Sequence, residues 1–562
     1  MLLINPATEQ FGGFLSRYIP LGLPIAVGTL AGYLKHYGHQ VNVADDEIEK
    51  LDENNIENYL KDSPKPYVFG LSILTSQAHR AYEITRMLKK KYPDCIIIMG
   101  GIHSTALPEE GLQKGADIVV RGEGEITLKI IYEAILEGKD WSKTPGITYK
   151  NKKGQFCSTL DALLVKDLDE IPIFPYHLFE NNKYNRGVIT GARGCPYKCS
   201  YCSQRLITGL TYRWFFTERV LETLDIIINK YGQDGIFFYD DNFSVNRRRV
   251  IELCEGIVSS GFHKKASFGV QTRADNLYPE IMPYLQKANF TSVGLGMETA
   301  SERLAKVIVK DQTVKKHTEI IKLARKWGIN AVVYLIYGLP TETAEDRRLS
   351  YNYTIDMDLI GTKFNNLIPY PGTKLYNEVK GTRQIHIEDD WKNFNSTIVS
   401  TQSIFNTTPI PYIPEGTHPW ELKRDTVKAN LGFYFKPKHI FNFFLRKDKT
   451  AQWALLPKGW MKSPREIYEV MKLGLTLLTN YFVALLPHYI GYFFYRIITG
   501  DILETRSGKT DRKNPDAIDG TMRIIKFDNE KNREKMVDIE RIQNPSSDEH
   551  FTTKKQKNLS YK

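Results

Sequence analysis

The sequence predicts an α/β protein built from two successive sheets and a helical end. Short apolar runs alternate with longer helix-like stretches over residues 1–150, and the same alternation returns over residues 187–400. Beyond residue 401 the strand-like runs stop. The chain of 562 residues is 42% apolar, which is typical of a folded protein longer than one ordinary domain. We therefore expect a doubly wound Rossmann-like domain, then a partial (β/α)6 TIM-like barrel, then a helical carboxyl-terminal region.

The first segment, residues 1–150, carries the pattern of a doubly wound parallel sheet. Helices are expected at Leu23–Tyr37 and Gln77–Lys91. The strand candidates, each bounded by Gly, Pro or Asp, are Leu2–Asn5, Val41–Ala44, Tyr67–Ser72, Cys95–Gly100 and Ile118–Arg121. Ligands of such sheets bind at the carboxyl ends of the strands, so the loops after the strands are the candidate binding loops.

Two of these loops carry small residues that suit a large flat ligand. The third strand ends at Ser72, whose hydroxyl can hydrogen-bond an amide group of a ligand. The fourth strand runs into Gly100 and Gly101, where a paired glycine lets the backbone approach a ligand closely. The alternative is ordinary turn chemistry. His103 is expected near the ligand rather than on a metal.

A connector at residues 151–186 leads into the barrel at 187–400. It begins with a predicted hairpin turn at Asn151–Gly154, and Pro172 and Pro175 disfavour a helix. Barrel helices are expected at Val220–Lys230 and Thr313–Trp327. The six barrel strand candidates are Val188–Gly191, Gly235–Tyr239, Ser267–Gln271, Ser292–Met297, Ala331–Tyr337 and Lys363–Ile368.

The loop after the first barrel strand holds the clearest chemical signal. Cys195, Cys199 and Cys202 follow one another with C-x3-C-x2-C spacing, which is typical of metal ligands because such short loops cannot reach disulfide geometry without strain. A structural zinc site needs four ligands, and no Cys or His follows within the next dozen residues. Three thiolates suit a 4Fe–4S cluster with one iron left open. The alternative is a reduced cysteine cluster or an incomplete zinc site.

This loop, with Tyr201 before its last cysteine, resembles the cluster loop of the radical S-adenosylmethionine superfamily. The Ser72 and Gly100-Gly101 elements, with the stretch from Gly101 to Glu125, resemble the amino-terminal domain of its cobalamin-binding members. The family's D-x-H-x-x-G motif, which supplies a histidine to cobalt, is absent, since Asn5–Gly13 contains no histidine. The resemblance, over residues 1–445, implies cobalamin bound without a protein histidine, or no cobalamin.

The same resemblance implies roles for residues at the ends of later strands. Tyr201 belongs to the cofactor-binding loop, and Asp241 ends the second barrel strand, where it can accept from the methionyl amino group of S-adenosylmethionine. Arg273 ends the third strand and can pair with the methionyl carboxylate. Glu298 ends the fourth and can accept from both ribose hydroxyls.

The implied activity starts from a 5′-deoxyadenosyl radical that abstracts hydrogen from the substrate. Carbon methylation with cobalamin as methyl donor is the main expectation, and oxidative cyclisation without methyl transfer is the alternative. A different class, a non-enzymatic iron–sulfur sensor or nucleic-acid-binding protein, is disfavoured because no basic stripe interleaved with aromatics lies near the cluster loop. We expect a small-molecule substrate, apolar or planar, no nucleic acid, and a one-electron donor such as flavodoxin or ferredoxin.

The remaining chain divides into a helical region at 401–504 and a charged tail at 505–562, which is expected to be largely disordered. Helices are expected at Trp420–Phe435 and His439–Arg446. Residues 473–495 contain no Lys, Arg, Asp or Glu, but Asn480, Pro487 and His488 disfavour a simple membrane span. They are expected either to lie in a membrane interface as a helix pair or to be buried helices that cover the barrel or line a substrate channel.

The cellular setting follows from the cysteines and the charge. Six cysteines, three of them outside the loop and scattered at Cys95, Cys157 and Cys254, indicate a reducing compartment. The start of the chain reads as a strand rather than a secretory signal. We expect a cytoplasmic protein, in which residues 473–495 are the candidate segment for contact with a membrane. The net charge of +11 suits an anionic substrate, a membrane surface or nucleic acid without choosing among them.

Overall fold

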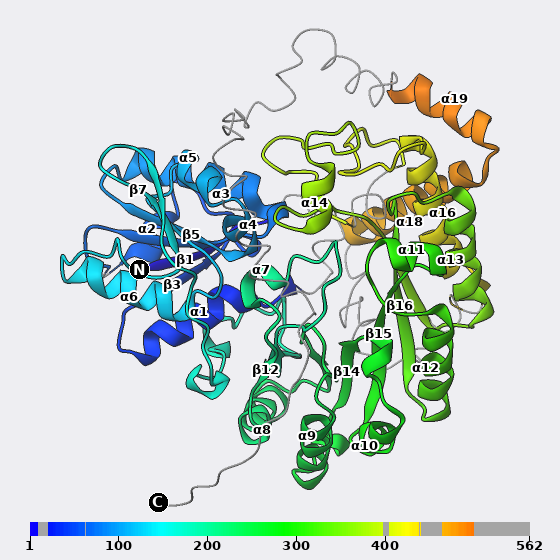
Figure 1. The fold of residues 1–562 in the computed structure, drawn as a ribbon, viewed down its shortest axis with the longest axis horizontal. Helices are drawn as coiled ribbons and strands as arrows, with labels where there is room; N and C mark the ends of the chain where they lie inside the picture. The colour runs from blue at the N-terminus through cyan, green and yellow to red at the C-terminus, as the bar shows by residue number, and fades with distance from the viewer. Residues whose placement is uncertain (9–20, 62, 397–403, 438, 440–463, 500–562) are drawn as a thin grey trace, which may run out of the picture. The chain divides into compact units, whose positions relative to one another are not determined.

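Two sheets organise the computed structural model, which describes residues 1–8, 21–61, 63–396, 404–437, 439 and 464–499 (Figure 1). The first sheet has seven strands and the second has six. Met1–Glu504 form one unit by their internal contacts. The boundaries expected near residues 150, 187 and 400 therefore stay predictions.

The first sheet has the order β3-β1-β4-β5-β6-β7-β8. Its parallel part is made of β1 (Leu2–Asn5), β3 (Asn42–Asp45), β4 (Val68–Ser72), β5 (Ile96–Gly100) and β6 (Ile118–Val120). The hairpin β7 (Ile147–Lys150) and β8 (Phe156–Ser158) adds two antiparallel strands at the edge. Its turn lies at the predicted Asn151–Gly154, where Gly154 has a φ of 76°. The sheet is thus mixed, and β8 lies within the range expected as connector.

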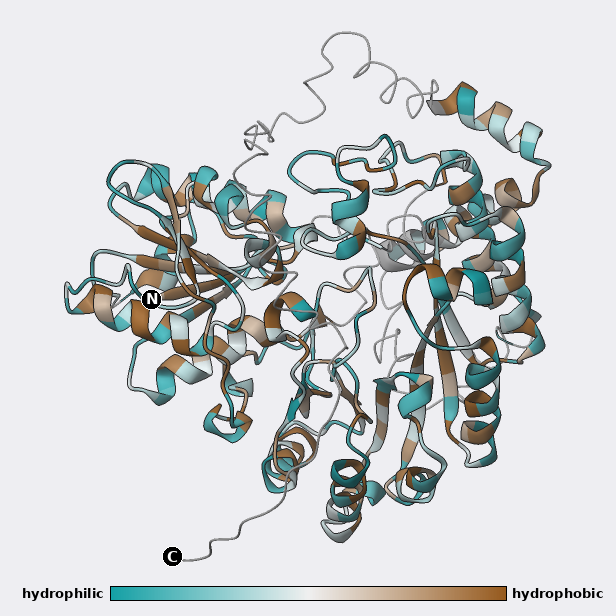
Figure 2. Ribbon diagram, in the orientation of Figure 1, coloured by the Kyte–Doolittle hydropathy of each residue, from teal (hydrophilic) through white to brown (hydrophobic). Residues whose placement is uncertain are grey.

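Helices cover both faces of this sheet because its strands are buried on both sides. α1 (Ile25–His36) and α6 (Glu125–Leu136) pack on one face. α2 (Ile56–Leu60), α3 (Ala78–Lys91) and α5 (Pro108–Gln113) pack on the other. Figure 2 shows the consequence, since the strands are largely hydrophobic and the helices are divided between hydrophobic and hydrophilic residues.

The second sheet is an open barrel of parallel strands in the order β10-β13-β14-β15-β16-β17, as expected from the sequence. The strands are β10 (Val188–Ile189), β13 (Gly235–Phe238), β14 (Ser267–Thr272), β15 (Phe290–Glu298), β16 (Asn330–Tyr337) and β17 (Gly361–Asn366). The helices outside it include α8 (Thr217–Asp225), α9 (Arg247–Ser259), α10 (Met282–Lys287), α12 (Val314–Lys326) and α13 (Ala344–Asp356) (Figure 1). All carboxyl ends of these strands face one mouth, which concentrates the loops there.

Among the described residues, three helices lie beyond residue 404. α16 (Pro419–Tyr434) packs on β17, close to the predicted bounds. α18 (Pro464–Leu485) and α19 (His488–Thr499) are separated at Pro487, so 473–495 forms a helix pair rather than one continuous helix. None of the helices in the described ranges has both the length and the apolarity needed to cross a membrane. The expected helix His439–Arg446 and the tail 505–562 fall outside the described residues.

Candidate functional site

The three predicted cluster ligands lie between two short strands, β11 (Ala192–Arg193) and β12 (Arg213–Trp214). Cys199 is buried, and Cys195 and Cys202 are half-buried. Burial raises the pKa of the Cys195 thiol and raises the pKa of Cys202 to about 11, and the neighbouring thiol charges add to both shifts. The surroundings of the loop thus disfavour a free thiolate, so a thiolate there needs a compensating positive charge.

The backbone before Cys195 is held by two consecutive aspartates at the end of β13. Asp240 Oδ1 accepts hydrogen bonds from the backbone N–H groups of residues 191 and 192, at 2.6 and 2.9 Å. Asp241 Oδ2 accepts from the N–H of Gly194 at 2.8 Å. These bonds fix the entry to the cluster loop against the barrel strand.

The donor set of the loop fits an iron–sulfur cluster better than a single metal ion. In the part of the chain that the structure describes, no three His, Cys, Asp or Glu side chains surround one metal position. A 4Fe–4S cluster does not require such convergence, because each thiolate binds a different iron. Cys195, Cys199 and Cys202 would then hold three irons and leave the fourth open to a ligand.

Arg273 lies beside the cluster loop, and its guanidinium is already engaged. Nε and Nη2 donate to the two carboxylate oxygens of Asp275 at 3.0 and 2.8 Å, and Nη2 also donates to the carbonyl oxygen of Lys310 at 2.9 Å. Nη1 lies 3.7 Å from Cys199 Sγ, and the guanidinium stacks 3.7 Å from the ring centre of Tyr197. Pairing of Arg273 with a methionyl carboxylate stays a prediction, and it would compete with Asp275.

Asp241 contacts residues that flank the three cysteines on both sides in the sequence. Besides Gly194, its Oδ2 accepts from Gln204 Nε2 at 2.9 Å. Burial raises the pKa of Asp241 to about 6, so near neutral pH it carries an incompletely compensated negative charge. Such a carboxylate can accept hydrogen bonds from an ammonium group, which is the role expected from the sequence.

Glu298 ends β15 in an unusual backbone conformation. Its φ is 67°, in the left-handed region that non-glycine residues rarely adopt and that is often found at functional sites. Its Oε1 accepts from the Tyr201 hydroxyl at 2.9 Å and from Lys310 Nζ at 3.0 Å. Although burial opposes it, the negative charges of Glu298 and, to a lesser extent, of a Cys199 thiolate raise the pKa of Lys310. No sequence pattern points to Lys310, because it lies in a loop after α11 (Glu302–Val307) without a spacing signal.

A cavity of about 740 Å³ lies between the carboxyl ends of the first sheet and the barrel mouth. The predicted residues Ser72, Gly100 and Gly101 line it from the sheet, and Thr190 and Asp241 line it from the barrel. Its walls are largely apolar, and its volume lies within the range of about 300–1,000 Å³ that is usual for ligand and cofactor pockets.

The two paired glycines have different structural reasons. Gly100 lies opposite Ser72 in the parallel ladder, and a Cβ there would meet only Val120, at 3.7 Å. The space next to the Cα atom of Gly100 is therefore open to the cavity. Gly101 has a φ of 87°, and a Cβ there would lie 2.6 Å from the backbone nitrogen of Ile73. Contact of Gly100 with a cofactor stays a prediction, whereas the glycine at position 101 is required by the turn itself.

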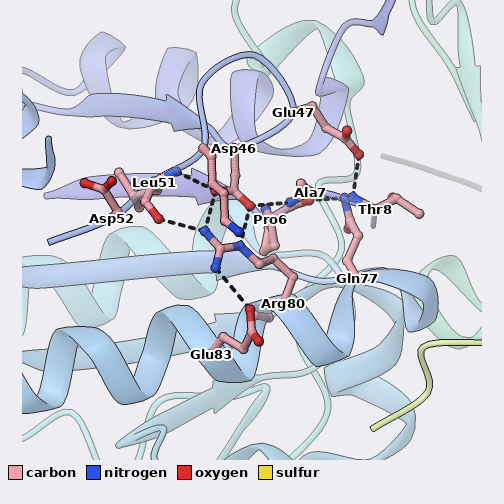
Figure 3. Close-up of polar contacts among 12 residues, drawn as sticks. Pro6, Ala7, Thr8, Asp46, Glu47, Leu51, Asp52, Gln77, Arg80 and Glu83 are labelled. Carbon is pink, nitrogen blue, oxygen red and sulfur yellow. Dashed lines mark hydrogen bonds and ion pairs between the residues drawn. The ribbon is translucent and has the colours of Figure 1, made fainter. Parts of the chain in front are cut away.

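Polar residues that the sequence did not single out line the end of the cavity near β3, and Figure 3 shows their polar contacts. Glu47 and Gln77 both line it, and Glu47 Oε1 accepts from the backbone N–H of Thr8 at 2.5 Å. The loop that carries Glu47 is supported by a buried ion pair, in which Arg80 donates to both oxygens of Asp46 at 2.8 and 2.9 Å. Glu47 and Gln77 carry the kind of hydrogen-bonding groups that amide substituents of a cofactor need.

His103 does not line this cavity, although it was expected from the sequence to lie near the ligand. It is buried, its Nε2 lies 3.0 Å from the Tyr82 hydroxyl and 3.7 Å from Glu110, and its ring packs edge-on against Trp391. No histidine is found among the described residues that line the cavity. The residues present therefore fit cobalamin bound without a protein nitrogen on cobalt.

Comparisons with known proteins identify both halves of this site. Residues 189–353 match the radical SAM superfamily, and residues 20–131 match the B12 binding domain. The first match contains all three cluster cysteines, and the second contains Ser72, Gly100 and Gly101 of the cavity wall.

Curated relatives are similar over most of the chain. An uncharacterized methyltransferase of Pyrococcus horikoshii is 28% identical over 78% of this chain and 93% of its own. The anaerobic magnesium-protoporphyrin IX monomethyl ester cyclase of Rubrivivax gelatinosus is 26% identical over 84% of this chain and 85% of its own. The hopanoid C-3 methylase of Methylococcus capsulatus is 25% identical over 66% of this chain and 70% of its own.

Solved structures share the fold. The radical S-adenosylmethionine methyltransferase TsrM from Kitasatospora setae, with cobalamin and a [4Fe-4S] cluster bound, has a TM-score of 0.63 at 17% identity, covering 90% of this chain and 99% of its own. The cobalamin-dependent S-adenosylmethionine radical enzyme OxsB, with aqua-cobalamin and S-adenosylmethionine bound, has a TM-score of 0.61 at 18% identity, covering 90% and 75%. The chain thus combines a B12 binding domain with a radical SAM domain, as in cobalamin-binding radical S-adenosylmethionine enzymes, and this pair of domains implies a 4Fe–4S cluster, S-adenosylmethionine and cobalamin as cofactors.

Proposed function

We propose that this enzyme methylates an unactivated carbon of a small-molecule substrate. The observation that carries the proposal is the continuous cavity from Gly100 at the sheet edge to Asp241 beside the cluster loop. A methyl donor at the sheet and a radical source at the barrel mouth would face one shared space there. Two of the relatives described above are named methyltransferase or methylase, which supports methyl transfer over the cyclase alternative.

The chain's own residues would bind and orient the cofactors. Bound together, the cluster and S-adenosylmethionine supply a 5′-deoxyadenosyl radical and cobalamin supplies the methyl group. Glu298, held by Tyr201 and Lys310, would accept from the ribose hydroxyls, and Asp241 would accept from the methionyl ammonium. The largely apolar cavity walls would exclude water from the reacting carbon and suit an apolar or planar substrate.

The products of S-adenosylmethionine distinguish methylation from cyclisation. The enzyme is purified anaerobically, loaded with hydroxocobalamin, and reduced chemically or with flavodoxin or ferredoxin, one of which we propose as the natural electron donor. We expect both 5′-deoxyadenosine and S-adenosylhomocysteine, the latter in at least one equivalent per bound corrinoid. Formation of 5′-deoxyadenosine without S-adenosylhomocysteine would contradict methyl transfer and favour the cyclase alternative.

We also propose that residues 473–495 contact a membrane surface through α18 and α19. One face of this pair packs on the protein, where Tyr495 lies 4.8 Å from the Trp420 ring and Asn480 accepts from the N–H of Ile404. The other face exposes large apolar side chains, mostly three or four residues apart. They are Tyr468, Met471, Leu475, Leu478, Phe482 and Leu485 on α18, and Tyr489, Phe493, Phe494, Ile497 and Ile498 on α19.

A lipid surface is the partner that this exposed face fits. Apolar side chains in a helical stripe enter the interface of a bilayer, and cations beside them bind anionic headgroups. Lys472 is exposed at the stripe, and the chain carries a net charge of +11. Because no described helix is both long enough and apolar enough to cross a bilayer, the contact would be peripheral.

Vesicle sedimentation tests this contact. We expect the full-length protein to sediment with phosphatidylglycerol vesicles, and high salt to release at least part of it because salt screens the headgroup attraction. Phe482→Asp should reduce sedimentation, whereas Leu160→Asp, at a residue 82% exposed elsewhere, serves as the matched control. Release by detergent alone would contradict a peripheral contact, and absence of sedimentation would contradict any membrane contact.

A further inference from the structure

The two strands that bracket the cluster loop place two arginines directly opposite each other. β11 and β12 pair antiparallel, and Arg193 is the register partner of Arg213. Like charges in directly opposed positions destabilise a strand pair. Since these strands enclose residues 194–212, closure of the cluster loop requires that the two positive charges be neutralised.

The neutralising carboxylates come from the segment that follows β6 of the first sheet. Glu123 accepts from Arg213 through both of its oxygens, at 2.9 and 2.5 Å, and from Arg193 at 3.4 Å. Glu125, the first residue of α6, pairs with Arg193 at 2.7 Å. Two cations thus meet two anions. Glu123 and Glu125 are 4% and 5% exposed, so water contributes little to their stabilisation.

The same network forms part of the cavity wall. Glu123, Glu125 and Arg193 all line the cavity of about 740 Å³ described above. The backbone N–H groups of residues 191, 192 and 194 donate hydrogen bonds to Asp240 and Asp241 of the barrel. Arg193 is the member of this stretch that pairs with Glu123 and Glu125, so it links the cavity wall to the cluster loop.

We propose that Glu123 and Glu125 close the cluster loop through Arg193 and Arg213 and thereby couple cluster retention to cofactor binding in the cavity. The four residues are positioning residues, and the proposal does not depend on whether a methyl group is transferred. Removing one partner leaves a buried charge uncompensated, which strongly favours opening of the strand pair. Coupling of this kind is reciprocal, so a closed loop must raise corrinoid affinity by the factor by which bound corrinoid raises cluster affinity.

The first test measures loss of iron from the reconstituted protein to an excess of chelator under anaerobic conditions. Glu123→Gln removes the shared charge and leaves the two arginines opposed, and we expect iron release to accelerate tenfold or more. Glu345→Gln, which removes an exposed ion pair with Arg348, is the control and should release iron at the wild-type rate. Wild-type retention in a folded Glu123→Gln protein would overturn the proposal.

A double variant separates electrostatic closure from simple structural damage. Glu123→Gln with Arg213→Gln removes one of the two opposed cations, so we expect iron release slower than in Glu123→Gln alone. A faster release in the double variant would show additive damage and overturn the proposal. Glu125→Gln, which disturbs only the Arg193 pair, gives the same test if Glu123→Gln does not fold. It should accelerate iron release less than fivefold but measurably.

The second test measures hydroxocobalamin affinity by absorbance titration, with and without the cluster. In the wild type we expect the cluster to tighten binding about tenfold, which corresponds to about 1.4 kcal/mol of coupling. In Glu125→Gln the two affinities should approach each other, whereas in Glu345→Gln the tenfold difference should persist. Equal affinities in the wild type would overturn the coupling.

Discussion

Substitution of the paired glycines gives the sharpest test of the cavity as the cobalamin site. Gly100→Leu adds a side chain to a position whose Cβ would meet only Val120, at 3.7 Å. The fold can accept this side chain, but it would occupy the space that we assign to the cofactor. Gly101→Ala instead places a Cβ 2.6 Å from the nitrogen and 2.8 Å from the carbonyl oxygen of Ile73, at a φ of 87°.

The two variants should therefore fail in different ways. Overpacking by one side chain costs about 1–3 kcal/mol, so Gly100→Leu should weaken corrinoid binding by about tenfold to a hundredfold with little effect on unfolding. Gly101→Ala should lower the free energy of unfolding by more than the roughly 1–2 kcal/mol that a left-handed backbone costs, because backbone overlap adds to it. Gly138→Ala isolates the backbone cost, since Gly138 has a φ of 64° and no atom within 4 Å of its Cβ.

Two measurements decide between these outcomes. Absorbance titration with hydroxocobalamin gives the affinity, and urea unfolding of the same anaerobic protein gives the free energy of unfolding. Wild-type corrinoid affinity in Gly100→Leu would refute the placement of the cofactor against Gly100. Equal destabilisation in Gly101→Ala and Gly138→Ala would refute the argument that overlap with Ile73 fixes the turn.

Three further predictions follow from the site and its surroundings. Cys199→Ala should abolish both the iron–thiolate absorbance near roughly 400 nm and 5′-deoxyadenosine formation, and cleavage of S-adenosylmethionine by the reconstituted variant would contradict the ligand assignment. Lys310→Met should weaken S-adenosylmethionine binding, measured by equilibrium dialysis, about tenfold because Glu298 loses its partner at 3.0 Å, and an unchanged affinity would exclude this role. Burial lowers the pKa of Lys423 to about 7, so the folded state binds fewer protons than the unfolded state between about pH 7 and 10.4. The free energy of unfolding should thus rise with pH by at most about 1.4 kcal/mol per unit in that window, and urea unfolding at pH 7 and 9 should show a smaller rise for Lys423→Met.

The sequence by itself determined the local features of this protein. The spacing of Cys195, Cys199 and Cys202 is a property of eight consecutive residues, and it indicated the cluster without reference to any other part of the chain. The alternation of apolar runs indicated both sheets, because the spacing of apolar residues within each strand or helix is a local property of the sequence. The break between α18 and α19 at Pro487 was likewise predictable, since proline disfavours a continuous helix through local backbone geometry.

Only the tertiary structure decided which charged side chains meet. Glu123 reaches Arg213 across 90 residues of sequence, and Lys310 reaches Tyr201 across 109. The sequence placed Arg273 at a strand end but did not show its contacts with Asp275 and Cys199. It suggested that Gly100 and Gly101 are both needed for the close approach of a ligand, whereas the fold requires Gly101 for the turn. Ion pairs and close backbone approaches depend on how separate elements pack, and a lysine or glutamate carries the same local signal whether it is solvated or buried against a partner.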